Sequence, residues 1–266
     1  MLYGSRLTSA HLGTIANVCI VCADDTYAVA AVADSDLEKE ELVQKMTEKV
    51  NEIGKTAGEQ GSEQWLKERR NRLTASNFGS VCRMRNTTSP KSTVQNLLYS
   101  TFKGNAATAY GLSQESETER QLVDWLVSRG ASEVSVSHPG LVPLPGHNVL
   151  GASPDGIVVC QPNHSNMPSH FIVEYKNPKK LNDLNLTVQE AVGLIKEFPL
   201  RKVDEKFELK KSHSFYYQVQ GVMAATGISE AAFVIRGAKS SMEVVWVPFD
   251  TEFFYTMPTE TFEVLF

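Results

Sequence analysis

Cysteine is scarce in this sequence. Only four cysteines occur among 266 residues: Cys19 and Cys22 form one Cys-x-x-Cys pair, and Cys82 and Cys160 stand alone. A zinc site needs a second pair of ligands at a usable spacing, and a disulfide framework needs an ordered set of pairs. The sequence offers neither pattern. We therefore interpret the cysteines as small apolar residues of a protein in a reducing compartment.

Long apolar runs and secretion signals are also missing. No stretch approaches the roughly twenty apolar residues that cross a bilayer. Residues 1–21 are interrupted by Arg6 and His11 and lack the charged start and cleavage site of a secretory signal. We expect a soluble intracellular protein without membrane contact, and the sequence does not distinguish nucleus from cytoplasm.

The chain has no excess of positive charge. It contains 26 Lys and Arg against 31 Asp and Glu, for a formal net charge of -5. This balance disfavours a protein that coats nucleic acid indiscriminately, because such binding relies on Lys and Arg. Local basic clusters still occur, although most such runs are solvated faces. They are Lys67 with Arg69, Arg70 and Arg72; Arg83 with Arg85; Lys176 with Lys179 and Lys180; and Arg201, Lys202, Lys206, Lys210 and Lys211.

The most informative stretch spans residues 151–178. Asp155 lies in a Pro-Asp-Gly turn, and two apolar runs follow it, separated by a polar loop over 161–170. Because side chains alternate along a strand, Glu174 and Lys176 on the second run point to the same side. If the two runs pair as a hairpin, Asp155 lies beside Glu174, and adjacent carboxylates favour a divalent cation such as Mg or Mn. The alternative is an ordinary turn and a strand whose Glu and Lys face water.

Residue patterns predict helices and strands along the whole chain. Ser35 to Glu38 is a capping box that opens an amphipathic helix. Ser76 is suited to cap a helix N-terminus. The free amides of such a terminus attract phosphate, so Ser76 either belongs to a phosphate site or is an ordinary helix cap. Glu115 lies near the start of a long helix predicted over 106–128. Further helices are predicted over 64–72, 93–102, 181–195, 215–226 and 249–266, the last broken at Pro258. Strands are predicted over 134–136, 148–150, 232–235 and 244–247. We also predict a linker over 54–61 and a turn-rich connection from His138 to His147 without a metal role.

Five ordered motifs carry a resemblance to a known family. They are residues 64–70 (QWLKERR), 72–79 (RLTASNFG), 110–115 (YGLSQE), the 151–178 stretch and 215–227 (FYYQVQGVMAATG). In this order, over about Gln64 to Gly237, the set resembles the YqaJ-like viral recombinase family. That family includes phage lambda exonuclease and belongs to the PD-(D/E)xK nucleases. The resemblance implies an α/β fold over 61–266, with a restriction-endonuclease-like core in which helices flank a mixed central β-sheet, and an N-terminal extension over 1–60.

The same resemblance implies an activity and its residues. The family member would be a Mg-dependent nuclease, with Mn as a substitute, that digests one strand of duplex DNA from its 5′ end. Its setting would be recombination, repair, or viral or mobile-element DNA processing. Asp155 and Glu174 match the metal-binding carboxylates, and Glu115 matches an acidic residue near the metals. Lys176 matches the catalytic lysine, and Gln218 matches the active-site glutamine.

The resemblance also implies DNA-binding residues and partners. Arg69, Ser76 and Ser153 fall where the family binds the terminal 5′ phosphate. Apart from the resemblance, two basic clusters are favoured for DNA contact because they adjoin the catalytic motifs: Lys67 with Arg69, Arg70 and Arg72, and Lys176 with Lys179 and Lys180. Double-stranded DNA ends are the implied substrate, and the resemblance allows a homo-oligomer and a single-strand annealing protein as partner.

Two other functions are kept as alternatives. One is another nuclease of the same superfamily, such as an endonuclease or a RecB-like nuclease. The iron–sulfur branch of those enzymes is disfavoured because no cysteine follows Gln218. The other is a catalytically silent module that binds DNA ends. It is disfavoured because Asp155, Glu174 and Lys176 are all intact.

Overall fold

A computed structural model describes residues 60–70, 72–85, 104–163 and 167–257 of the chain. The predicted N-terminal extension, the helix over 93–102 and the C-terminal residues from Pro258 lie outside the described residues, as do Cys19 and Cys22. Cys82 and Cys160 are free thiols. No helix in the described ranges is both long and apolar enough to cross a membrane.

A five-stranded mixed sheet forms the centre of the fold, in the order β10-β9-β6-β5-β2. Its strands are β2 (Ser132–Ser137), β5 (Gly156–Gln161), β6 (His170–Lys176), β9 (Glu230–Arg236) and β10 (Met242–Pro248). β6 and β9 are parallel, whereas the other neighbours are antiparallel. This arrangement confirms the predicted mixed sheet, including the hairpin of β5 and β6.

Two smaller sheets accompany the central one. β1 (Leu73–Thr74), β4 (His147–Ala152) and β3 (Val142–Leu144) form a three-stranded sheet in the order β1-β4-β3. β7 (Leu200–Val203) and β8 (Lys206–Leu209) form a separate hairpin. The sequence pattern did not predict β3, which lies in the turn-rich connection before β4. It also did not predict β7 and β8, which lie in the basic run before residue 211.

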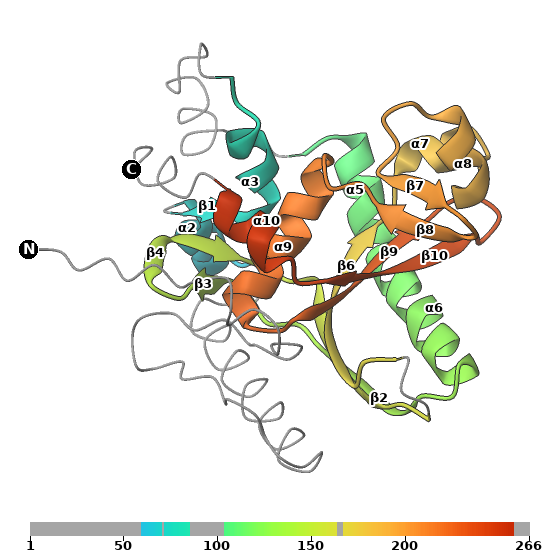
Figure 1. Ribbon diagram of the computed structural model, residues 1–266, viewed down its shortest axis with the longest axis horizontal. Coiled ribbons are helices and arrows are strands. Elements are labelled where there is room, and N and C mark those ends of the chain that lie inside the picture. The colour runs from blue at the N-terminus through green and yellow to red at the C-terminus, as the bar shows by residue number, and fades with distance from the viewer. Residues whose placement is uncertain (1–59, 71, 86–103, 164–166, 258–266) are drawn as a thin grey trace, which may run out of the picture.

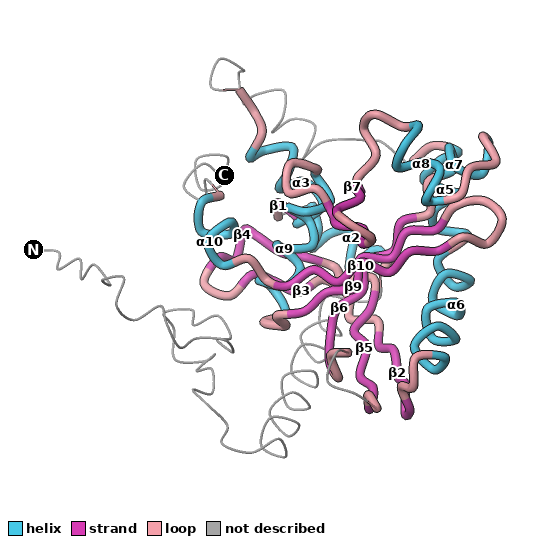
Figure 2. The backbone as a smooth tube through the Cα atoms, turned by 45° about the vertical axis from the view of Figure 1, so that its right-hand side comes forward, coloured by secondary structure: helices cyan, strands magenta, loops and turns pink. Residues whose placement is uncertain are grey.

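Helices pack on both faces of the central sheet. Figure 2 shows α6 on one side of β6 and β9, and α9 on the other. Leu122 and Leu126 of α6 join the core on the first face, whereas Val219, Val222 and Met223 of α9 join the core on the second. The helices are α2 (Glu63–Arg70), α3 (Ala75–Cys82), α5 (Ala106–Ser113), α6 (Glu115–Ser128), α7 (Lys179–Asp183), α8 (Val188–Leu194), α9 (Ser214–Thr226) and α10 (Thr251–Thr256).

The single helix predicted over 106–128 is wrong, because the chain breaks into α5 and α6 at Gln114. Thr118, which is completely buried, donates its hydroxyl to the Gln114 carbonyl at 2.9 Å and lies 2.6 Å from the Asn177 side-chain oxygen. Asn177 also donates to the Gly111 carbonyl at 3.4 Å. A residue just beyond β6 thus stabilises the break, which makes Glu115 the first residue of α6.

Helix α9 lies against α3 through a glycine. A Cβ atom on Gly221 would come within 2.7 Å of the Phe78 ring and 2.9 Å of the Ala75 Cβ. Phe78 is 1% exposed and has no room to retreat. Gly221 therefore allows the middle of α9 to approach α3 closely.

Candidate active site

Asp155, Glu174 and Lys176 meet at one end of the β5–β6 hairpin. The pairing of Gly156 with Val173 places Asp155 next to Glu174 in register. The Asp155 carboxylate accepts a hydrogen bond from the Tyr175 amide at 2.7 Å. The Lys176 ammonium donates to Oε1 of Glu174. The structure therefore brings together the three residues that the turn and strand patterns predicted to converge.

Burial makes the two carboxylates hard to ionise. The Glu174 side chain is 1% exposed, and burial together with the charge of Asp155 raises its pKa to about 8. Burial also raises the pKa of Asp155, against the opposing effect of Lys176. Burial would lower the pKa of Lys176, but Glu174 and Asp155 outweigh it and raise that pKa. Ionising both carboxylates is therefore costly, and the one neighbouring lysine does not offset that cost.

One oxygen of Glu174 has no partner. Its Oε2 is buried and accepts no hydrogen bond from any described residue. Such an orphaned acceptor is costly unless a donor or a cation reaches it. No three His, Cys, Asp or Glu side chains within the described ranges are grouped so as to hold a metal by themselves. The donors that fit a hard divalent cation are thus the Asp155 and Glu174 oxygens, with coordination left for water or substrate.

Gln218 on α9 also reaches Glu174. Its side-chain amide donates to Oε1 at 2.5 Å, the same oxygen that Lys176 contacts. Gln220 has a different place: it is completely buried, donates to the Pro248 carbonyl at 3.0 Å and accepts from the Asp250 amide at 2.8 Å. Of the two glutamines on this helix, only Gln218 contacts the carboxylate cluster in the described part of the chain.

Glu115 lies close enough to the cluster to respond to its charges. Burial and the Asp155 carboxylate raise the pKa of Glu115 to about 7, whereas Lys176 and His138 lower it. It is the first residue of α6, directly after the break at Gln114. The structure therefore places Glu115 near the other two acids, where the family resemblance implied an acidic residue.

The sequence did not identify two neighbours of the site, His138 and Glu119. His138 was interpreted only as a loop residue, yet its Nδ1 lies 2.8 Å from the Asp155 carbonyl oxygen and its Nε2 lies 3.2 Å from the Glu119 carboxylate. The Tyr175 hydroxyl donates to the same Glu119 carboxylate at 3.4 Å. The spacing of Glu115 and Glu119 could have indicated that Glu119 also lies near the site, because residues four apart share a helix face.

Arg69, Ser76, Trp65 and Ser153 form a second polar group beside the cluster. Arg69 donates to the Ser76 hydroxyl at 3.0 Å, and the indole of Trp65 donates to the Ser153 hydroxyl at 3.1 Å. The Arg69 guanidinium lies over the Trp65 ring, 4.8 Å from its centroid. Burial lowers the pKa of Arg69, and the charges of Glu174 and Asp155 oppose that shift. The three predicted phosphate residues are therefore joined through Trp65.

The predicted capping role of Ser76 is wrong. Helix α3 begins at Ala75, its N-cap is Thr74, and no side chain caps it. Ser76 is inside the first turn, where its hydroxyl lies 3.1 Å from the Thr74 hydroxyl and accepts from Arg69. Its hydroxyl therefore remains oriented toward Arg69 rather than toward the helix amides.

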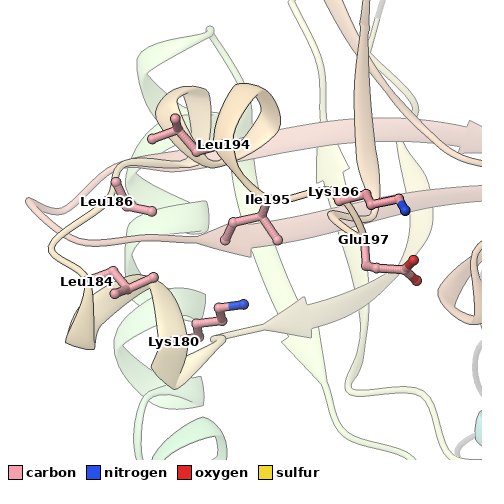
Figure 3. A pocket seen from close by; sticks show the side chains of 7 residues that line it. All are labelled: Lys180, Leu184, Leu186, Leu194, Ile195, Lys196 and Glu197. Atoms are coloured by element: carbon pink, nitrogen blue, oxygen red, sulfur yellow. The ribbon is translucent and has the colours of Figure 1, made fainter.

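Lys179 and Lys180 lie on α7, away from these contacts. Lys179 pairs with Asp183 at 2.6 Å, one turn further along the helix. Lys180 lines a hollow of about 480 Å³ between α7 and α8, and Figure 3 shows its side chain with the six others that line it. The other lining residues are Leu184, Leu186, Leu194, Ile195, Lys196 and Glu197. This hollow contains none of the carboxylates described above.

Comparison with known proteins assigns the chain to a family. Residues 64–229 match the YqaJ-like viral recombinase domain, which is more than half of the 266 residues. The chain belongs to the YqaJ-like viral recombinase family. This membership, together with the fold, identifies it as a nuclease and confirms the predicted resemblance.

The chain is similar to solved structures of exonucleases. The alkaline exonuclease LHK-Exo from Laribacter hongkongensis is 21% identical, with a TM-score of 0.52 over 77% of this chain and 90% of that chain. Its complex with dAMP is 20% identical, with a TM-score of 0.53 over 77% and 91% of the two chains. A phage-related exonuclease from Haemophilus somnus is 14% identical, with a TM-score of 0.46 over 73% and 91%. No curated protein matches the sequence.

Proposed function

We propose that this protein is a Mg-dependent exonuclease that removes nucleotides from the 5′ ends of duplex DNA. The observation that carries the proposal is the buried pair of Asp155 and Glu174, with an unpartnered Glu174 oxygen and the Lys176 ammonium beside it. A structural ion pair would satisfy its acceptors internally, whereas this cluster leaves one open. The catalytic domain in this proposal is residues 61–266.

Asp155 and Glu174 would hold the divalent cation, and Glu115 would add a further carboxylate near it. When bound, a divalent cation makes water nucleophilic near neutral pH and stabilises charge on a phosphate. Oxygen-only donors favour Mg, with Mn as a substitute. The Tyr175 amide fixes the Asp155 carboxylate, and Gln218 fixes the Glu174 carboxylate, so both are oriented before the cation arrives.

Lys176 supplies a positive charge at a defined point. Its side chain is 19% exposed, and its ammonium is held by Glu174, so it is directed into the cluster rather than into solvent. A fixed ammonium can donate to a non-bridging oxygen of the scissile phosphate or orient the attacking water. In either position it favours the transition state, because negative charge accumulates on the phosphate oxygens there.

Arg69, Ser76 and Ser153 would bind the terminal 5′ phosphate. A guanidinium with adjacent hydroxyls matches the oxygens of a phosphate monoester, which carries more charge than an internal diester. The Trp65 contacts hold Arg69 and Ser153 in place. This site would select DNA ends, which supports exonucleolytic over internal cleavage and a role in recombination, repair, or viral or mobile-element DNA processing. LHK-Exo was solved with a nucleotide, dAMP.

The test is digestion of end-labelled duplex DNA, with and without a 5′ phosphate, in Mg and in chelator. Release of nucleotides from the 5′ strand only in Mg supports the proposal. Nicking of closed circles would indicate an endonuclease instead. Retention of DNA ends without cleavage in Mg or Mn would indicate a module that only binds DNA ends.

A further inference from the structure

Phe215, the second residue of α9, lies over the Lys176 ammonium. The Lys176 nitrogen is 4.7 Å from the centroid of the Phe215 ring. A cation within about 6 Å of an aromatic face is attracted by the ring quadrupole, more strongly where water is partly excluded. We infer that Phe215 is a positioning residue that holds the Lys176 ammonium in the active site, an inference that rests on the function proposed above.

The Phe215 ring is itself held in place. His213 packs against it with centroids 4.5 Å apart, and Phe233 packs against it at 5.8 Å. Phe233 is completely buried and lies directly across from Glu174 in the β6–β9 register. The ring is therefore held against β9, the strand that pairs directly with β6, which carries both Glu174 and Lys176.

One turn of α9 serves both members of the ion pair. Phe215 and Gln218 are three residues apart and thus lie on one side of the helix. Phe215 faces Lys176, and Gln218 donates to Glu174. The start of this helix is fixed because the His213 side chain caps it by accepting from the Phe215 amide at 3.2 Å.

The ring provides something that the carboxylate does not. Lys176 has a flexible four-carbon stem, and Glu174 restrains it only by accepting a hydrogen bond from its ammonium. A phosphate oxygen would compete for the same N–H groups. The aromatic face attracts the charge as a whole, so it can hold the ammonium in position while N–H groups remain available to the substrate.

The contact can be tested without metal, DNA or activity. In protein carrying ¹³C-labelled lysine, protons of a side chain over a ring face shift upfield, so the Lys176 ε-methylene signal should lie upfield of the other lysines. Lys176→Ala identifies the signal by removing it. Phe215→Leu should return it to the ordinary lysine range. A Lys176 signal already in that range in the unaltered protein would overturn the inference.

The catalytic consequence is a change in kcat with little change in KM. Phe215→Leu keeps an apolar side chain of similar size but removes the quadrupole, and we expect kcat to fall about tenfold, the factor that a contact of this kind can supply. The KM for duplex DNA should stay within about twofold, and Phe215→Tyr should restore most of kcat, because only the ring face matters.

A fluorinated series separates charge from shape. Mono-, di- and trifluorophenylalanine at position 215 weaken the ring quadrupole stepwise with small changes in volume, so log kcat should fall stepwise. The matched control is the same series at Phe171, which is buried edge-on to Trp246 on the opposite face of the sheet. Equal kcat values across the series at 215 would overturn the inference. Absence of cleavage by the unaltered protein would instead refute the proposed function, and the lysine signal would still decide the contact.

Discussion

The Asp155 carboxylate accepts a hydrogen bond from the backbone amide of Tyr175, 2.7 Å away. Tyr175 stands between Glu174 and Lys176, and the ladder between β5 and β6 ends with Gly156 opposite Val173. Beyond that pair, the Asp155 side chain takes the place of a backbone acceptor. The turn is thereby locked to the strand at the residue that separates the acid from the lysine, and the three charges cannot drift apart while the hairpin is intact.

This arrangement predicts that Lys176→Ala abolishes cleavage and leaves DNA binding largely unchanged. The substitution removes the cation at the cluster, whereas duplex affinity depends on many phosphate contacts. We expect cleavage to fall at least about a hundredfold, as for loss of a transition-state donor. Nuclease rates and duplex affinity measured in the same buffer check this. The control is Lys179→Ala, which removes a half-buried lysine that pairs with Asp183 on α7. An unchanged rate for Lys176→Ala would show that the assignment is wrong.

The two glutamines of α9 should separate activity from stability. Gln218→Leu removes the donor that orients Glu174, so we expect cleavage to fall about 10- to 100-fold. Gln220→Leu leaves the Pro248 carbonyl and the Asp250 amide without their partner, and should lower the free energy of unfolding by about 1–3 kcal/mol. The measurements are the nuclease rate and the free energy of unfolding in urea of both variants. Equal losses of rate and of stability in the two variants would show that the glutamines do not have separate roles.

The hairpin that carries the site could be predicted from local signals. A Pro-Asp-Gly turn, an apolar run and alternation around Glu174 and Lys176 suffice to place three charges together, and the structure agrees. The approach of Arg69, Glu115 and Gln218 is different. It was expected only from the family resemblance, because no local pattern relates a residue on α2, α6 or α9 to the end of β6.

Features that depend on distant partners escaped prediction. The break at Gln114 is stabilised by Asn177, which lies more than sixty residues later, so the helical pattern over 106–128 gave no sign of it. The β7–β8 hairpin was hidden because its sequence resembles a basic run. In the structure, ion pairs occupy two of its basic residues: Arg201 pairs with Glu208 across the strands, and Lys202 pairs with Glu205 at the turn.

Arg69→Ala should remove the preference for 5′-phosphorylated ends. The guanidinium is the one full positive charge in the group formed with Ser76, Trp65 and Ser153, so an end with a phosphate and an end with a hydroxyl should then be digested at similar rates. The control is Arg70→Ala, which removes the adjacent exposed arginine. Comparison of initial rates on the two kinds of end is the measurement. Full retention of the preference in Arg69→Ala would place the phosphate site elsewhere.

Two glycine substitutions should have opposite effects. Alanine is favoured over glycine within a helix by about 1 kcal/mol. At Gly193 on α8 an added Cβ would meet no atom within 4 Å apart from its chain neighbours and its own helix backbone, so Gly193→Ala should stabilise the protein. At Gly221 the added Cβ would meet the buried Phe78 ring at 2.7 Å, and an overpacking cost of about 1–3 kcal/mol should outweigh the helix term. Thermal unfolding of both variants tests this, and a stabilised Gly221→Ala would show that the α3–α9 contact adapts.

Stability without metal should fall as pH rises. The pKa of Glu174 is raised from 4.5 to about 8 in the folded protein, chiefly by burial, and that of Glu115 to about 7. Between about pH 4.5 and 8 the folded state therefore holds protons that the unfolded state has released, so the contribution of these groups is complete below pH 4.5 and is lost as pH passes 8.

Magnesium should reverse this loss, because a cation binds the deprotonated carboxylates and competes with their protons. The rise in Tm on adding Mg should be larger at about pH 8.5 than at about pH 6, where Glu174 and Glu115 hold their protons. The control is Glu174→Gln, which keeps the shape of the side chain but neither titrates nor attracts a cation. It should show a weaker dependence on pH and little response to Mg. An equal Mg effect at both pH values, or in Glu174→Gln, would mean that the ion binds away from this carboxylate pair.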